Sequence, residues 1–284
     1  MSKSSLVASA VATLLATTLV LAAPQNAGAP APVTQNPPAQ GARGGGRAAP
    51  QGPPPTAQAQ APIDLTGYWV SVVTEDWRWR MLTPAKGDYA SVPLNTEGQR
   101  VAGLWDLNKD KAEGNLCRAF GAAGLLRLPL RIHVTWQDAH SLKLETDSGQ
   151  QTRLFLFGAP PAGAGERSWQ GRSIAQWYKQ PQLSGLGFGG GRGSVAGGNL
   201  RVTTTNMRAG YLRKNGVPYS EDAVLTEYFN RHDEPNGDQW ITVTRVVDDP
   251  KYLTMPFITS EAFKKERDGS KWRPTPCEIE PPRS

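Results

Sequence analysis

Short runs in which apolar and polar residues alternate cover most of the chain after residue 62. A period of two is typical of β-strands with one buried face, and these runs are rich in Val, Thr, Leu and aromatic residues. We expect strands at Leu65 to Thr74, Trp77 to Leu82, Arg131 to Gln137, Leu142 to Asp147, Gln151 to Phe157, Trp169 to Tyr178, Leu200 to Thr205, Val224 to Arg231, and Gln239 to Val247. Turn residues such as those of Pro235-Asn236-Gly237 separate them. The pattern therefore favours an antiparallel barrel or sandwich.

Helical periodicity is rare in the chain. Asn95 or Thr96 can cap a helix that reaches about Lys111, with Val101, Leu104 and Trp105 on one face. The predicted fold class is accordingly all-β, an antiparallel barrel or sandwich with one or two short helices.

Two hairpins can be aligned by pairing their apolar faces. Placing Phe229 opposite Val243 also places Glu227 opposite Arg245, so both charges lie on an apolar face. This register requires a loop of odd length or a bulge, because a two-residue turn shifts the pairing by one.

In the second hairpin, pairing Leu144 with Leu154 puts Glu145 opposite Arg153, on the face that also carries Lys143. We expect an ordinary solvated pair across the strands there.

The first 62 residues have a different composition. An uncharged run from Leu6 to Ala22 follows Lys3, which is the layout of a secretory signal peptide cleaved near Ala22. An uncleaved membrane anchor is the alternative, although the run is short for a span. Residues 23–62 are rich in Pro, Ala, Gln and Gly, and we expect a disordered tether. Residues 63–284 form the predicted barrel domain, in a periplasmic or extracellular protein.

The charge excess lies largely outside the predicted domain. The chain has 31 basic and 25 acidic residues, but residues 1–62 hold three of the basic residues and none of the acidic ones, which leaves 28 − 25 = +3. Because the remaining charges alternate in sign, a nucleic-acid partner is not expected. No later segment has the roughly 20 apolar residues of a membrane helix, so we expect no span in the mature protein.

Cys117 and Cys277 are the only cysteines, and neither belongs to a C-x-x-C pair. In an oxidising compartment we expect them to form a disulfide that ties the C-terminal tail to the domain. Two buried free thiols are the alternative.

The segment Asp64-Leu65-Thr66-Gly67-Tyr68-Trp69 contains a G-x-W at the entrance of a β-rich domain. It resembles the opening signature of lipocalins and related calycin barrels. The resemblance implies an all-β, antiparallel lipocalin-like barrel with one or two short helices, whose base Trp69 closes.

A second resemblance runs from Trp169 to Pro250 and concerns a family of secreted bacterial proteins of uncharacterised function. It rests on Trp169-Gln170-Gly171-Arg172-Ser173-Ile174-Ala175-Gln176-Trp177, Thr204-Thr205-Asn206, Pro218-Tyr219-Ser220-Glu221, Thr226-Glu227-Tyr228-Phe229 and Val247-Asp248-Asp249-Pro250, and the two cysteines fit the same order. Arg172 and Tyr219 stand where the family implies histidines, and Thr203 where it implies an aspartate. If those positions are catalytic in the family, the substitutions imply a lost or altered activity here.

Glu227 is the main candidate for chemistry. A carboxylate on the interior face and paired with Arg245 is desolvated, which shifts a pKa and occurs at active sites as well as in structural ion pairs. Arg153 is a second candidate, with Glu145 as its expected surface partner, and either Arg153 or Arg245 can hold an anion. The glycine pattern Gly185 to Gly190 precedes a strand, so it does not predict a nucleotide site. The three histidines lack metal-ligand spacing, and we expect neither a metal nor a cofactor.

The residues around this carboxylate suggest a cavity that binds by burial. We expect a small apolar or aromatic ligand, with Arg153, Trp177, Tyr219, Arg245 and Trp69 as binding residues. One alternative is a cofactor-free lyase, hydratase or isomerase in which Glu227 is the general acid or base. Another is a cell-envelope interaction module that binds through Arg78 and Arg80, which alternate with Trp77 and Trp79. The sequence leaves the ligand and the oligomeric state open.

Overall fold

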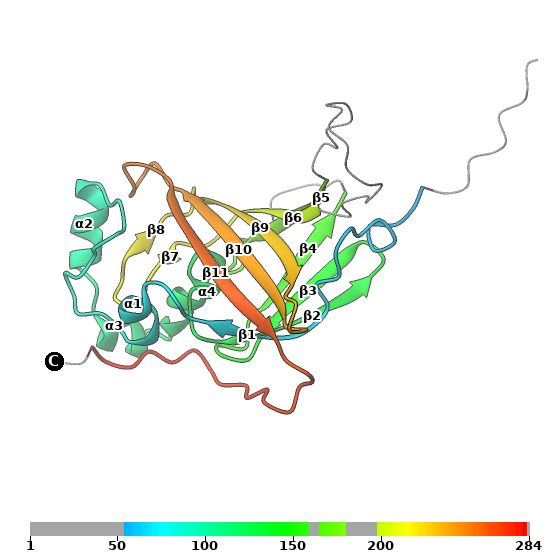
Figure 1. Ribbon diagram of the computed structural model, residues 1–284. Coiled ribbons are helices and arrows are strands. Elements are labelled where there is room, and N and C mark those ends of the chain that lie inside the picture. The colour runs from blue at the N-terminus through cyan, green and yellow to red at the C-terminus, as the bar shows by residue number, and fades with distance from the viewer. Residues whose placement is uncertain (1–53, 159–164, 180–197, 283–284) are drawn as a thin grey trace, which may run out of the picture. The chain divides into compact units, whose positions relative to one another are not determined.

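The computed structural model describes residues 54–158, 165–179 and 198–282. Nine strands close into a barrel in the order β1-β11-β10-β9-β6-β5-β4-β3-β2 (Figure 1). The barrel strands are β1 Gly67–Val72, β2 Arg131–Asp138, β3 Ser141–Thr146, β4 Thr152–Phe157, β5 Arg172–Lys179, β6 Gly198–Thr205, β9 Val224–Asp233, β10 Gln239–Asp248 and β11 Phe257–Lys265. A separate hairpin consists of β7 Gly210–Tyr211 and β8 Pro218–Tyr219. The predicted all-β barrel is confirmed.

One pair of neighbouring strands departs from the antiparallel arrangement. Strands β4 and β5 run parallel, with Phe155 beside Ser173, whereas the other neighbours around the barrel are antiparallel. Parallel strands need a longer connection than a hairpin provides, and residues 158–171 supply it. Strand β11, which closes the barrel between β1 and β10, is absent from the sequence prediction.

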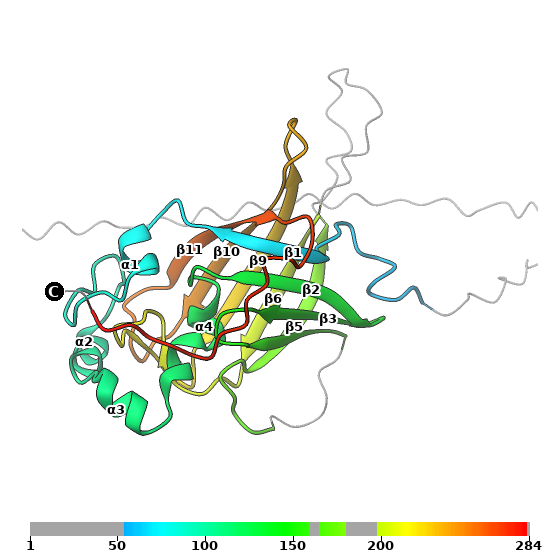
Figure 2. The same ribbon diagram turned by 90° about the horizontal axis from the view of Figure 1, so that it is seen from below.

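Short helices gather at one end of the barrel, together with the β7–β8 hairpin (Figures 1 and 2). They are α1 Trp77–Met81, α2 Thr96–Gly103, α3 Leu107–Ala112, the 3-10 helix η1 Leu116–Phe120, and α4 Ala122–Leu125. We call this the helical end. It positions the candidate site described below.

The predicted helix from Asn95 to Lys111 is wrong in its length. Asn95 caps α2 as expected, because its side chain accepts a hydrogen bond from the Gly98 N–H. The chain then breaks, and Asp106 caps α3 by accepting from the N–H groups of the next turn. Leu104 lies at the break and is 67% exposed, so it does not share a buried face with Trp105.

The predicted strand from Trp77 to Leu82 is also wrong. Asp76 adopts a left-handed conformation, and its carbonyl accepts from the N–H groups of Trp79 and Arg80, which starts α1. As a result Trp77 is exposed and Arg80 is buried. Arg78 and Arg80 therefore do not share one exposed surface.

The two predicted hairpin registers have opposite outcomes. Phe229 pairs with Val243 and Glu227 with Arg245 across an odd-length loop, as predicted. In the β3–β4 hairpin the prediction is wrong by one residue, because Leu144 faces Arg153 instead of Leu154. A one-residue slip reverses both faces of a strand, so Arg153 points into the barrel.

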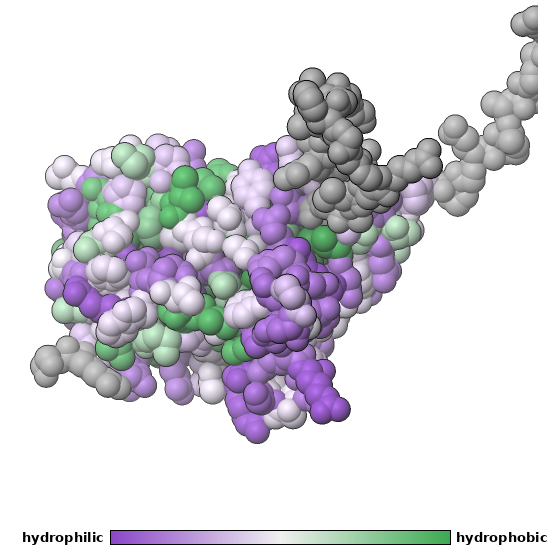
Figure 3. Space-filling view, in the orientation of Figure 1, coloured by the Kyte–Doolittle hydropathy of each residue, from purple (hydrophilic) through white to green (hydrophobic). Residues whose placement is uncertain are grey.

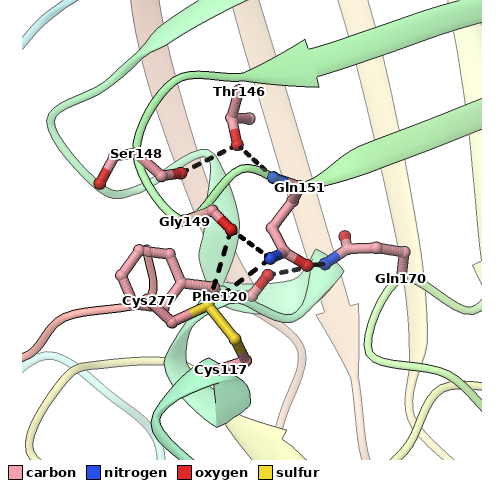
Figure 4. Close-up of a disulfide and its surroundings, with 8 residues drawn as sticks. All are labelled: Cys117, Phe120, Thr146, Ser148, Gly149, Gln151, Gln170 and Cys277. Carbon is pink, nitrogen blue, oxygen red and sulfur yellow. Dashed lines mark hydrogen bonds between the residues drawn. A yellow bond between two sulfur atoms is a disulfide. The ribbon is translucent and has the colours of Figure 1, made fainter. Parts of the chain in front are cut away.

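The predicted disulfide between Cys117 and Cys277 is present (Figure 4). It joins the C-terminal tail to η1, next to the turn between β3 and β4. The Gln151 side chain donates toward Cys277 Sγ and accepts a hydrogen bond of 2.8 Å from Gln170 Nε2. Gln170 also donates to the Phe120 carbonyl, so the tail, the turn and η1 are held together.

The surface seen in Figure 3 is mainly hydrophilic, with scattered apolar patches. Within the described residues, no helix has the length and apolar character needed to cross a membrane. Residues 54–62 contact the barrel, since the Ala57 carbonyl accepts from Trp177 Nε1 and Gln58 N donates to Ala139. The predicted signal peptide, most of the predicted tether and Gly185 to Gly190 lie outside the described residues.

We predict that replacing both cysteines, as C117S/C277S, lowers the free energy of unfolding by about 4–5 kcal/mol, because the bond closes a loop between residues 160 positions apart. Urea unfolding of the oxidised chain and of the double variant measures the difference. Coincident unfolding curves would contradict the prediction.

Candidate functional site

Glu227 lies inside the barrel and is completely buried. Its carboxylate forms a bidentate pair with Arg153, at 3.1 Å from Nη1 to Oε1 and 2.6 Å from Nη2 to Oε2. Arg153 Nη2 also donates to Thr204 Oγ1 at 3.0 Å, and Thr204 is hydrogen-bonded to Ser173. Such two-pronged pairs are among the strongest hydrogen-bonded contacts of a carboxylate.

A second arginine reaches the same carboxylate from β10. Arg245 Nε lies 3.3 Å from Glu227 Oε1, and Arg245 Nη2 donates to the carbonyl oxygens of Ala122 and Ala123 at 2.9 and 2.7 Å. These carbonyls belong to α4. Arg245 therefore connects the interior of the barrel to the helical end.

The cluster continues to the surface through a second carboxylate. Glu261 Oε1 lies 3.9 Å from Arg245 Nη1 and 3.2 Å from Arg127 Nη1. Arg127 in turn pairs with the partly exposed Asp76 at 2.8 Å. Positive and negative side chains thus alternate from Arg153 to the surface, and each buried charge has an opposite neighbour.

Glu261 is less well compensated than Glu227. Its Oε2 atom is buried and has no hydrogen-bond partner among the described residues. Burial raises the pKa of Glu261 above its ordinary value, although Arg245 and Arg127 act in the opposite direction.

Apolar side chains fill the interior beyond the ion cluster. Phe155 and Phe229 lie two residues further along the strands of Arg153 and Glu227, and their ring centroids are 5.5 Å apart. Trp69 and Trp177 lie beyond this layer and donate their indole N–H groups to the carbonyls of Leu65 and Ala57. Trp240 is only partly buried, and the Lys264 ammonium lies over its ring.

Tyr219 belongs to β8 at the helical end, near Arg153 and Arg245 of the ion cluster. It is fully buried, and its hydroxyl has no hydrogen-bond partner among the described residues. A Cβ atom at Gly121 or Gly210 would lie 2.1 or 2.6 Å from this hydroxyl, so both glycines make its position possible. Burial raises the pKa of Tyr219, and the positive charges of Arg153 and Arg245 oppose the shift. The phenol therefore stays protonated at neutral pH and is a hydrogen-bond donor.

A cleft of about 310 Å³ opens next to Tyr219, between α2, α3 and the β7–β8 hairpin. Aromatic and charged side chains line it, including Trp105, Asp110, Arg118, Tyr211, Tyr219 and Tyr252. Its volume is at the lower end of the range for small-molecule sites.

Asp110 organises one wall of the cleft. Its carboxylate is buried and accepts from Arg118 Nη1 at 3.0 Å and from the Tyr211 hydroxyl at 2.8 Å. Burial and the hydrogen bond to Asp110 raise the pKa of Tyr211 to about 12, against the opposing effect of Arg118. This wall is therefore rigid, with its polar atoms already satisfied.

Unlike Asp110, Trp105 has a polar group that is not satisfied by a hydrogen bond within the described residues. Trp105 lines the cleft, and its buried indole N–H, like the Tyr219 hydroxyl, has no acceptor among the described residues. Two buried donors without acceptors at one cleft are unusual, because buried polar groups are nearly always paired.

The structure brings together four of the predicted site residues, namely Arg153, Glu227, Arg245 and Tyr219. Trp69 and Trp177 lie at the other end of the barrel. The cleft residues Asp110, Arg118 and Tyr211 were not predicted. Asp110 sits in a polar helix and Arg118 beside a cysteine, so no local pattern marks either residue.

Comparisons with protein-family models, with curated proteins and with solved structures find no match for this chain.

We predict that Glu227→Gln lowers the free energy of unfolding by about 3 kcal/mol or more, because it leaves Arg153 and Arg245 as buried charges without a full counter-charge. Glu145→Gln is the matched control, since Glu145 pairs with Lys143 at the partly exposed outer face. We expect it to cost less than about 1 kcal/mol. Urea unfolding measures the free energy of unfolding of both variants. Equal losses in the two variants would contradict the prediction that the buried ion cluster contributes more to stability than the outer pair.

A pH series tests the direction of the Glu261 shift. A carboxyl whose pKa is higher in the folded chain than its ordinary value of 4.5 binds its proton more readily there. It thus supports folding at low pH, and this support is lost as the pH rises through the folded-state pKa. Glu261→Gln keeps a neutral side chain throughout. We therefore expect the stability of the wild-type chain relative to this variant to fall as pH rises above 4.5.

Unfolding of both chains in urea at several pH values from about 4.5 to 8 supplies the comparison. A difference that stays constant, or that changes in favour of the wild-type chain as pH rises, contradicts the raised pKa.

Proposed function

We propose that the protein binds a small ligand with a flat apolar or aromatic face and at least one hydrogen-bond acceptor, in the cleft at the helical end. The observation that carries the proposal is that two residues lining this cleft, Tyr219 and Trp105, each have a buried donor without an acceptor in the described part of the chain. A ligand acceptor would satisfy either donor, and leaving a buried donor unsatisfied costs free energy.

The walls of the cleft suit a planar ligand. Trp105, Tyr211 and Tyr252 contribute aromatic surface, which stabilises stacked or edge-on rings. Asp110 holds Tyr211 in place, so the site is organised before a ligand arrives. Preorganisation reduces the entropy lost on binding.

This proposal places the ligand in the cleft and not around Glu227. Both oxygens of Glu227 already accept from arginine nitrogens, and bulky apolar side chains occupy the interior beyond them. The same occupancy weakens the alternative of an enzyme that uses Glu227 as a general acid or base. The alternative of an envelope module loses its basic stripe, because Arg80 is buried.

We also propose that the protein is exported to the periplasm or beyond. The Cys117–Cys277 disulfide supports this location, since such bonds persist mainly in oxidising compartments.

A probe set tests the ligand class directly. Acetophenone has a ring and an acceptor, ethylbenzene has the ring alone, and cyclohexyl methyl ketone has the acceptor without an aromatic face. We expect acetophenone to bind most tightly in calorimetric or NMR titrations. Tyr219→Phe should lower the affinity for acetophenone by about 3–10-fold, which corresponds to the loss of one hydrogen bond.

Tyr89→Phe is the matched control, because Tyr89 also has a hydroxyl without a partner but does not line the cleft. Equal effects of the two variants, or equal affinities for the three probes, argue against the proposed site.

A further inference from the structure

The tip of the β7–β8 hairpin, residues 212–217, carries a buried charge that the cleft does not use. Leu212 N donates to the Val217 carbonyl and Gly216 N to the Arg213 carbonyl, which closes the tip. The Asn215 side chain then donates to the carbonyls of Ala85 and Asp88 at 2.9 and 3.0 Å. The tip is thus fixed against the loop that follows α1.

Arg213 is only 4% exposed, and all three of its guanidinium nitrogens lack a hydrogen-bond partner among the described residues. Its guanidinium carbon lies 4.9 Å from the centroid of the Trp79 ring, so a cation–π contact holds it in position. An aromatic face does not supply the acceptors that the five N–H groups of an arginine require.

The neighbouring carboxylates are already engaged. Asp88 accepts from Arg78 at 2.6 Å and from Trp79 Nε1 at 3.0 Å, and Asp76 pairs with Arg127. Glu75 likewise pairs with Arg80. Asp76 and Asp88, the two acids that act on Arg213, therefore each pair with another arginine, and Arg213 has no ion pair among the described residues.

The electrostatic surroundings agree with this geometry. Burial, together with repulsion from Arg127, lowers the pKa of Arg213 to about 10, whereas Asp76 and Asp88 act in the opposite direction. The guanidinium nevertheless remains charged at neutral pH, so this buried positive charge has no hydrogen-bond acceptor in the part of the chain that the structure describes.

We propose that Arg213 anchors a second binding site, which takes one small oxyanion such as a phosphate or a carboxylate. The oxygens of either group can accept two parallel N–H bonds from a guanidinium, and the negative charge compensates the positive one. This site is separate from the proposed function, because Arg213 and Trp79 do not line the cleft.

Thermal unfolding of the full chain tests the proposal. Sodium phosphate or sodium acetate should raise the midpoint by at least about 2 °C over sodium chloride of equal ionic strength, since a ligand that binds only the folded state stabilises it. The phosphate and acetate series distinguish the two sources of the oxyanion. The anion-specific shift should vanish in Arg213→Met.

Arg78→Met is the matched control. Arg78 also lies 4.9 Å from the Trp79 ring centroid, but it is exposed and paired with Asp88. This variant should keep the shift. An equal loss in both variants, or a shift that survives in Arg213→Met, overturns the assignment.

Calorimetric titration of the wild-type chain with each anion gives a result that does not depend on the folding of a variant. One site per chain for at least one of the two anions supports the proposal. Binding of neither anion overturns it.

Discussion

The bidentate pair between Arg153 and Glu227 is the interaction on which the arrangement of the barrel depends. It joins β4 to β9 inside the closed sheet, and Arg245 extends it to β10 and to the carbonyls of α4. An unpaired charge at any of these positions would be strongly unfavourable in the interior. The register of β4 and the position of α4 are therefore set by the same few contacts.

This constraint reaches the cleft through α4 and Tyr219. Arg245 holds α4, and Gly121, which precedes it, leaves room for the Tyr219 hydroxyl. Burial beside the two arginines keeps the phenol protonated, because it raises the pKa of Tyr219 despite their charge. The ion cluster thus helps to fix the position of one cleft residue, whereas burial keeps that residue protonated.

The sequence predicted the strand pairing correctly where the apolar residues of both strands point into the barrel. In β9 and β10 the apolar pairs Phe229–Val243 and Leu225–Val247 outnumber the single ion pair, so the alignment was correct. In β4 the inward residues are Arg153 and Phe155, while Leu154 and Leu156 point outward. Matching leucine to leucine therefore failed, because the partner of Arg153 lies 74 positions away on another strand. The cleft was unpredictable for the same reason, since Asp110 and Tyr211 meet only in the folded chain.

A buried ion cluster contributes little net stability to a barrel, since a fold with well-packed apolar side chains of the same volume is often at least as stable. Its value here is geometric. An apolar contact tolerates sliding, whereas the donors of Arg153 and Arg245 must meet particular oxygens of Glu227, Ala122 and Ala123. Only one register of β4 and one position of α4 satisfy them all. The cluster therefore favours a single arrangement of the helical end, which is what a preorganised cleft requires.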